Sequence, residues 1–127
     1  MNEKVSVVKD EHQQQQVPSI WRKTLEKIIE SFVGQDYSLN EGIDSVGSIS
    51  NNLASYIQEN IEEYGETLIC LPEETWETSV CQWMESYWDV LIDLYTSESG
   101  LSDLVLVVRV YERGGSYYFE VNSLHIP

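Results

Sequence analysis

The sequence WDVLIDLY, residues 88–95, decides the fold class of this chain. Apolar and polar side chains alternate along it, and a period of two is typical of a β-strand with one buried face. The face that we expect to be buried carries Trp88, Val90, Ile92 and Leu94, and the opposite face carries Asp89, Leu91, Asp93 and Tyr95.

The sequence after this stretch predicts an antiparallel meander. Residues 97–100 are expected to turn the chain, and residues 103–112 are rich in β-formers. The sequence RGGS at residues 113–116 is a hairpin signal, because glycine readily adopts the positive φ angles of tight turns. Residues 117–121 are expected to pair back, with residues 124–126 extending that strand.

Two helices are predicted ahead of the strands. The first begins at Pro18 or Ser19, because proline is favoured in the first helical turn, and Gly34 ends it. The second begins near Ser48 or Ser50, and Gly65 follows it as the usual C-terminal glycine. Apolar residues recur at helical spacing in both: Ile20, Trp21, Leu25, Ile28, Ile29 and Phe32, then Ile49, Leu53, Tyr56, Ile57, Ile61 and Tyr64.

The remaining segments complete the predicted organisation. Residues 67–71 form a short apolar run that predicts a strand, and residues 72–87 fit either a helical turn or a long loop, with Trp76, Val80, Trp83 and Met84 at helical spacing. Residues 1–16, which include the run Gln13–Gln16, predict a disordered tail. The expected fold is a single α+β domain over residues 17–127, with a three- to four-stranded antiparallel sheet and two helices packed on one face.

The charge of the chain constrains its partners. Seven Lys and Arg against 22 Asp and Glu give a net charge of −15. Between Lys27 and Arg109 there are sixteen acidic residues and no basic one. This charge opposes binding to nucleic acid or an anionic membrane, and it favours fast, salt-sensitive capture of a cationic surface. Plain solubility is the alternative explanation.

Other features of the sequence point to a cytoplasmic chain. Residues 1–16 lack the apolar core of a secretory signal, and there is no apolar run of about 18 residues that could cross a membrane. Cys70 and Cys81 lie in apolar surroundings, and we expect two buried, reduced thiols.

The sequence offers little that could perform catalysis. A hydrolytic triad needs a base, yet His12 lies in the expected tail and His125 is almost terminal. No phosphate-binding glycine loop is present. A weak cation site could form if four carboxylates converge at one end of a hairpin, namely Asp89, Asp93, Glu98 and Asp103. We expect no enzyme activity, no metal and no cofactor.

The C-terminal third resembles a known family. Its pattern W-x-V-x-x-D-L begins at Trp88 and is followed by Glu98, Gly100 and the sequence SDL at residues 102–104. It is similar to a small bacterial domain family of unknown function, over roughly the last 40 residues. The chain departs from that pattern because Leu101 follows Gly100 where the family has a basic residue. In size and acidity the chain also resembles immunity proteins of bacterial toxin–immunity pairs.

These observations predict a binding protein that neutralises a basic protein toxin, such as an RNase or DNase, by occluding its cationic active site. The alternatives are a DNA mimic that acts against a defence system, and a small cation-binding domain or enzyme. Acids and aromatics supply the expected contacts, because carboxylates pair with Arg and Lys, and Trp and Tyr anchor protein interfaces. A solvated surface for the acids and core packing for the tryptophan are the competing interpretations. The candidate partner-binding residues are Glu62, Glu63, Glu66, Glu73, Glu74, Trp76, Glu77, Asp93, Tyr95, Glu98 and Asp103.

Overall fold

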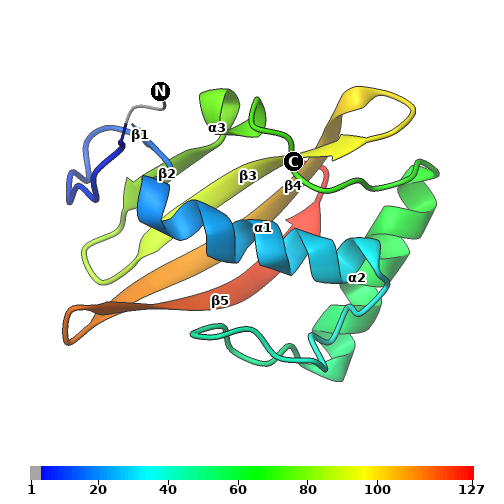
Figure 1. The fold of residues 1–127 in the computed structure, drawn as a ribbon, viewed down its shortest axis with the longest axis horizontal. Helices are drawn as coiled ribbons and strands as arrows, with labels where there is room; N and C mark the ends of the chain where they lie inside the picture. Colours follow the sequence, from blue (N-terminus) through cyan, green and yellow to red (C-terminus); the bar gives the residue numbers. More distant parts are fainter. Residues whose placement is uncertain (1–3) are drawn as a thin grey trace.

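The computed structural model describes residues 4–127, and over this range the chain forms an α+β fold (Figure 1). An antiparallel sheet is confirmed, but it has five strands rather than three or four, in the order β1-β2-β3-β4-β5. Three helices accompany it rather than two. The elements are β1 (Gln15–Gln16), α1 (Ser19–Val33), α2 (Asn51–Tyr64), α3 (Thr75–Thr78), β2 (Val80–Trp83), β3 (Trp88–Thr96), β4 (Gly100–Arg113) and β5 (Ser116–His125).

The alternation of residues 88–95 produces the central strand that it predicts. Trp88, Val90, Ile92 and Leu94 of β3 are fully buried, while Asp89, Leu91 and Asp93 on the opposite face are half-buried. Adjacent strands continue the buried face, since Val90 lies opposite Val108, and Val108 lies opposite Val121. The predicted turn and the RGGS hairpin both join neighbouring antiparallel strands, which confirms the meander.

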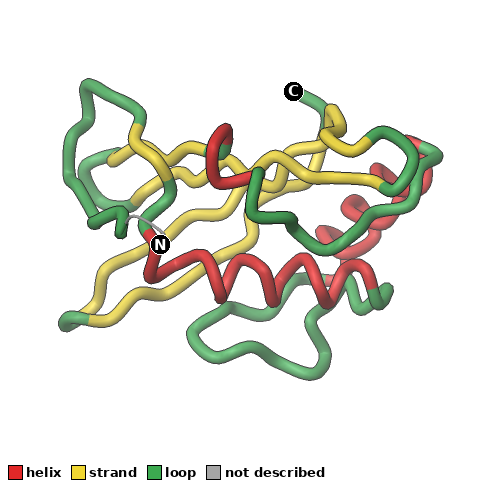
Figure 2. Tube along the Cα trace, turned by 45° about the horizontal axis from the view of Figure 1, so that its top comes forward, coloured by secondary structure: helices red, strands yellow, loops and turns green. Residues whose placement is uncertain are grey.

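Helix α1 covers the buried face of the sheet (Figure 2). Its buried residues recur at helical spacing, as the sequence predicts, and Trp21 stands at the centre of the contact. The Trp21 ring meets Trp88 edge-on at a centroid distance of 5.2 Å, and Tyr117 at 5.4 Å. Such aromatic pairs contribute about 0.5–1.5 kcal/mol beyond their area burial.

Helix α2 begins and ends where the sequence predicts. The Ser50 hydroxyl accepts a hydrogen bond from the Leu53 N–H at 3.2 Å, and Gly65 ends the helix in the left-handed conformation with φ of 78°. The helix lies beside β5, where the Asn60 side-chain amide donates to the Leu124 carbonyl at 2.7 Å. This contact satisfies a backbone acceptor at the edge of the sheet.

The segment before β3 differs from its predicted helical spacing. Only one helical turn forms, α3, and β2 follows it directly, so Val80 and Trp83 belong to a strand. The predicted strand over residues 67–71 is also wrong in extent. Only an isolated bridge forms there, between Leu68 and Thr96, with the Ile69 N–H donating to the Tyr95 carbonyl at 3.0 Å. Both segments lie along the side of β3 that faces away from β4, and they form hydrogen bonds with its backbone N–H and carbonyl groups.

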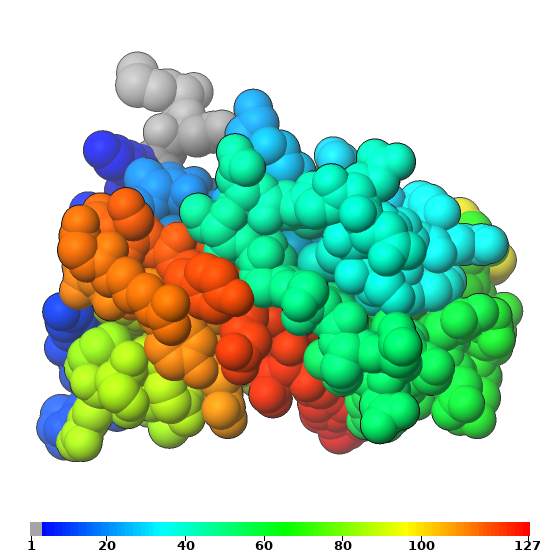
Figure 3. Space-filling view, turned by 90° about the horizontal axis from the view of Figure 1, so that it is seen from below, coloured from blue at the N-terminus to red at the C-terminus, as the bar shows by residue number. Residues whose placement is uncertain are grey.

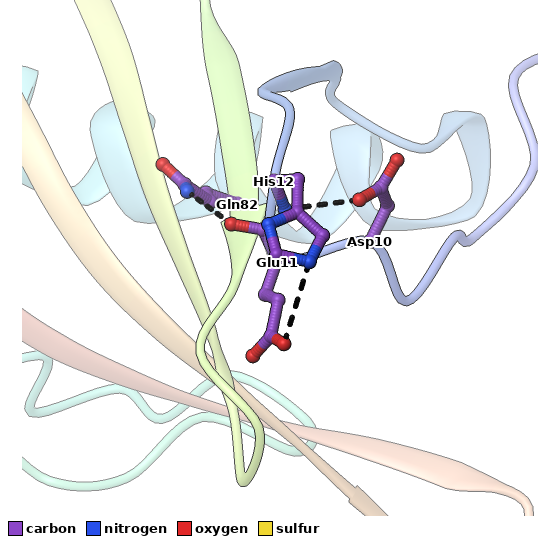
Figure 4. Close-up of polar contacts among 4 residues, drawn as sticks. All are labelled: Asp10, Glu11, His12 and Gln82. Carbon is purple, nitrogen blue, oxygen red and sulfur yellow. Dashed lines mark hydrogen bonds and ion pairs between the residues drawn. The ribbon is translucent and has the colours of Figure 1, made fainter.

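The expectation of a disordered tail over residues 1–16 is corrected for residues 4–16, and residues 1–3 lie outside the described range. This segment packs against the end of the core, where the indole N–H of Trp88 donates to the Val8 carbonyl at 2.9 Å. The Lys9 ammonium lies 5.2 Å from the Trp83 ring centroid and 2.8 Å from the Glu112 carboxylate. The Gln82 amide donates to the Glu11 carbonyl at 2.9 Å, which ties the turn at residues 10–12 to β2 (Figure 4).

The loop between α1 and α2 lies against the β4–β5 hairpin (Figure 3). Val46 bridges to Phe119, and the Phe119 backbone exchanges hydrogen bonds with Ser45 and Gly47. A Cβ atom at Gly47 would lie 2.3 Å from the Tyr118 hydroxyl, so glycine permits this close approach. The loop thereby covers part of the outer edge of β5, which would otherwise be free to pair with another chain.

Two further findings bear on the predicted setting. Cys81 is buried as expected, but Cys70 is exposed, which corrects the prediction of two buried thiols. Among residues 4–127, no helix combines the length and apolar character needed to cross a membrane.

Candidate functional site

The sixteen acidic residues between Lys27 and Arg109 remain almost unpaired. Among residues 4–127, one of them lies within ion-pair distance of a basic side chain, and this is Asp89, 3.5 Å from the Arg109 guanidinium. The other two ion pairs of the described chain join Lys9 to Glu112 and His12 to Glu11. The acidic segment therefore keeps its negative charge available at the surface.

A buried polar network fixes α3 against β3. The Thr75 hydroxyl donates to the Asp93 carbonyl at 2.6 Å, and the Ser79 hydroxyl accepts from the Asp93 N–H at 3.0 Å. The two hydroxyl groups also lie 2.9 Å apart. Thr75 and Ser79 are 0% and 1% exposed, so water does not compete for these bonds. The network holds the acids that flank Thr75 at a fixed place beside Asp93.

Three of the predicted acids carry charges that act on the Tyr95 phenol. Burial raises the pKa of the Tyr95 phenol above its usual value, and the nearby charges of Glu74, Asp93 and Glu77 raise that pKa further. Glu74 directly precedes α3, Glu77 lies within it, and Asp93 and Tyr95 both belong to β3. We call these four residues the Tyr95 cluster.

Trp76 does not occupy the exposed position expected of a surface anchor. It is 3% exposed, because it packs into the core beside α1, with the Arg22 guanidinium 5.3 Å from its ring centroid. Burial and the charge of Glu73 raise the pKa of Glu26, while the proximity of the Trp76 indole lowers it. Glu26 nevertheless lies outside hydrogen-bond geometry, and the indole N–H is buried without a partner. The charge of Glu73 therefore acts on Glu26 of α1.

Glu66 and Glu98 are occupied by bonds within the chain. The Glu98 carboxylate accepts from the Thr67 N–H at 2.8 Å and the Thr67 hydroxyl at 3.0 Å. Glu66 accepts from the Thr96 hydroxyl at 2.6 Å and the Ser99 hydroxyl at 2.9 Å. The bonds to Thr67 and Ser97 lower the pKa of Glu98. These two acids join the end of α2 to the β3–β4 turn.

The remaining predicted acids belong to α2 and β4. Glu62 and Glu63 are exposed on α2, and Glu62 accepts from the Gln58 amide at 3.1 Å. Asp103 is also exposed, and its N–H donates to the Tyr64 hydroxyl at 3.1 Å. The neighbouring Ser102 is buried and donates to the Leu94 carbonyl at 2.7 Å.

The structure does not assemble the cation site considered from the sequence. Asp89 pairs with Arg109 and Glu98 bonds Thr67, so these two carboxylates have other partners. Asp89 and Asp93 are four residues apart on one strand, which separates them by about 13 Å. Within residues 4–127, no group of three or more His, Cys, Asp or Glu side chains is arranged to hold a metal ion.

Sequence reasoning missed a second cluster on the sheet face opposite α1. Here the Arg109 guanidinium lies 4.7 Å from the Tyr87 ring centroid, and the Arg113 guanidinium lies 4.8 Å from Tyr118. Tyr111 pairs with Tyr118 across β4 and β5 and also lies under Arg113. The alternation of Arg109, Tyr111 and Arg113 along one strand was the available signal, because it places all three on one face.

The fold and the unpaired acidic residues define a small α+β domain with an acid-rich surface. The chain belongs to the family described as a domain of unknown function (DUF7668), whose model matches residues 29–127. This confirms the resemblance to a small domain family of unknown function. The match begins within α1, so the segment that covers the end of the core precedes it. No curated protein and no solved structure matches the chain.

Proposed function

We propose that this protein is a non-catalytic inhibitor of the immunity-protein kind, which binds a basic toxin and covers its cationic active site. The observation that carries the proposal is the unpaired acidic segment, in which one of sixteen carboxylates has a basic partner among residues 4–127. Self-repulsion of this size costs folding stability, and a cationic partner would relieve it on binding.

A nuclease toxin suits this surface well. Nuclease active sites are cationic because they bind phosphates, so an acidic protein can occupy them through complementary charge. Long-range attraction also accelerates encounter, and a cell needs its inhibitor to capture the toxin before damage occurs. Of the predicted contacts, Glu73, Glu74, Glu77 and Asp93 are the best placed, because α3 and β3 hold them on a fixed frame. Glu62, Glu63 and Asp103 would extend the surface, whereas Glu66 and Glu98 have structural bonds.

The test is to produce this protein together with the product of the neighbouring reading frame. The proposal predicts a complex that survives purification at low salt, weakens as salt rises, and suppresses nuclease activity of that product. A complex with unchanged nuclease activity, an affinity indifferent to salt, or two proteins that elute separately at low salt would contradict it.

A further inference from the structure

We infer that the hollow between α2 and the end of β5 is a binding site for a small organic amine. The apolar body of the amine lies between tyrosine and aliphatic side chains, and its ammonium group lies beside Glu63. This site goes beyond the proposed function, because it uses other residues than the Tyr95 cluster and needs no toxin to fill it.

The hollow has the size of a small-molecule pocket. Its volume is about 490 Å³, within the range of about 300–1,000 Å³ that such pockets occupy. Helix α2 forms one wall, because its lining residues are three or four positions apart and therefore share one face of the helix. Strand β4 and the end of the chain form the opposite wall. The lining residues of α2 are Tyr56, Asn60, Glu63 and Tyr64.

Apolar side chains line the hollow and stay uncovered. Tyr56 is 44% exposed and Ile126 is 55% exposed. Leu104 also lines the hollow, but it is 1% exposed and belongs to the core. The hollow therefore joins a core residue to two exposed apolar side chains. A ligand that covers Tyr56 and Ile126 removes apolar surface from water, and this burial favours binding.

Hydrogen bonds hold the walls of the hollow in place. The Asn60 side-chain amide donates to the Leu124 carbonyl at 2.7 Å, which joins α2 to β5. The Tyr64 hydroxyl accepts from the Asp103 N–H at 3.1 Å, which joins α2 to β4. The site is therefore formed before a ligand arrives, and less ordering entropy is lost on binding.

The charge of the lining selects a cation. Glu63 is the only Asp or Glu in the lining, and within residues 4–127 no Lys or Arg side chain lies within ion-pair distance of it. The rings of Tyr56 and Tyr64 add attraction, because the face of an aromatic ring is electron-rich and attracts a cation. A bare metal ion matches this site poorly, since Ca²⁺ and Mg²⁺ need several oxygen ligands. An ammonium on an apolar body matches both the acid and the walls.

The probes are hexylammonium, hexanol and hexanoate, which share one alkyl chain and differ in charge. Each is titrated into the isotope-labelled full chain and followed through backbone amide shifts. The variants are Glu63→Gln and Tyr56→Leu, both at exposed positions, so the fold is retained. The matched control is Glu59→Gln, because Glu59 is also an exposed acid of α2 but does not line the hollow.

Hexylammonium is expected to shift the amides of residues 60–64 and 124–126 and to bind at least about fivefold more tightly than hexanol. Hexanoate should leave these amides unchanged. Glu63→Gln should abolish the preference for the ammonium and Tyr56→Leu should reduce it, while Glu59→Gln should keep it. Equal affinity for hexylammonium and hexanol, equal losses in Glu63→Gln and Glu59→Gln, or shifts spread over every acidic stretch would overturn the site.

Discussion

The Thr75 hydroxyl donates a 2.6 Å hydrogen bond to the carbonyl of Asp93, eighteen residues away, and this bond joins the single turn of α3 to the central strand. The bond supports a fold element too short to be stable alone, because an isolated helical turn fixes many dihedral angles for one hydrogen bond. It also fixes the positions of the acidic residues at α3.

Replacing Thr75 with valine should destabilise the protein and loosen α3. The substitution keeps the shape but leaves the Asp93 carbonyl and the Ser79 hydroxyl without their partner in a buried place, which costs about 1–3 kcal/mol. Urea unfolding measures the loss. The control is Thr78→Val, whose hydroxyl makes only a 3.5 Å contact at the exposed side of the turn. Equal effects of the two substitutions would show that the buried bond does not anchor α3.

Ser50→Ala should lower the free energy of unfolding by about 1 kcal/mol, because the side chain that caps α2 is lost and the Leu53 N–H loses its acceptor. Ser48→Ala serves as the control, since Ser48 is exposed and lies outside the helix. Thermal unfolding of both variants gives the comparison. A cap at Ser48 instead of Ser50 would reverse the order of the two melting temperatures.

Glu98→Gln should lower the free energy of unfolding by an amount that depends on pH. The folded-state pKa of Glu98 is lowered, so its charged form stabilises the fold above the unfolded pKa, and this contribution is lost as pH falls through the folded pKa. The variant should therefore be less stable than the wild type at about pH 7, with the difference shrinking toward about pH 3. Unfolding midpoints of the two proteins, measured across this range, test the assignment. A difference between wild type and variant that grew on acidification would contradict it.

The two cysteines should react at different rates. Burial raises the pKa of the Cys81 thiol to about 11, so this residue is protonated and shielded at neutral pH. Cys70 is exposed. A thiol reagent should modify one group quickly in the folded chain, and Cys70→Ser should remove this fast phase. A fast phase that persists in Cys70→Ser would place Cys81 at the surface.

The sequence predicted the elements whose signals are local. Strand β3 follows from the alternation of residues 88–94, although Tyr95, which was expected on the exposed face, is buried. Helices α1 and α2 follow from apolar spacing with Ser50, Gly34 and Gly65 at their ends. Strand β2 was missed, because four residues without clear alternation can match helical spacing by chance. The defined conformation of residues 4–16 was missed for another reason. It depends on contacts with Gln82, Trp83 and Trp88 that no local pattern encodes.

The candidate site was predictable in composition but not in grouping. The excess of acids is visible in the chain, yet the sequence does not tell Glu98, which bonds Thr67, from Glu77, which lies near Tyr95. Trp76 looked suited to an interface because acids surround it in sequence. Its partner Arg22 lies on α1, far away along the chain, and this long-range contact places Trp76 in the core.

The central claim is that carboxylates on α3 and β3 recognise a cationic protein. Its most direct measurement is the affinity for the product of the adjacent reading frame, determined by calorimetry for E74Q/E77Q/D93N and for E59Q/E62Q/E63Q. The two variants lose the same formal charge. The account predicts that the first binds at least about tenfold more weakly than the second. Equal affinities, or a larger loss in the α2 variant, would contradict it.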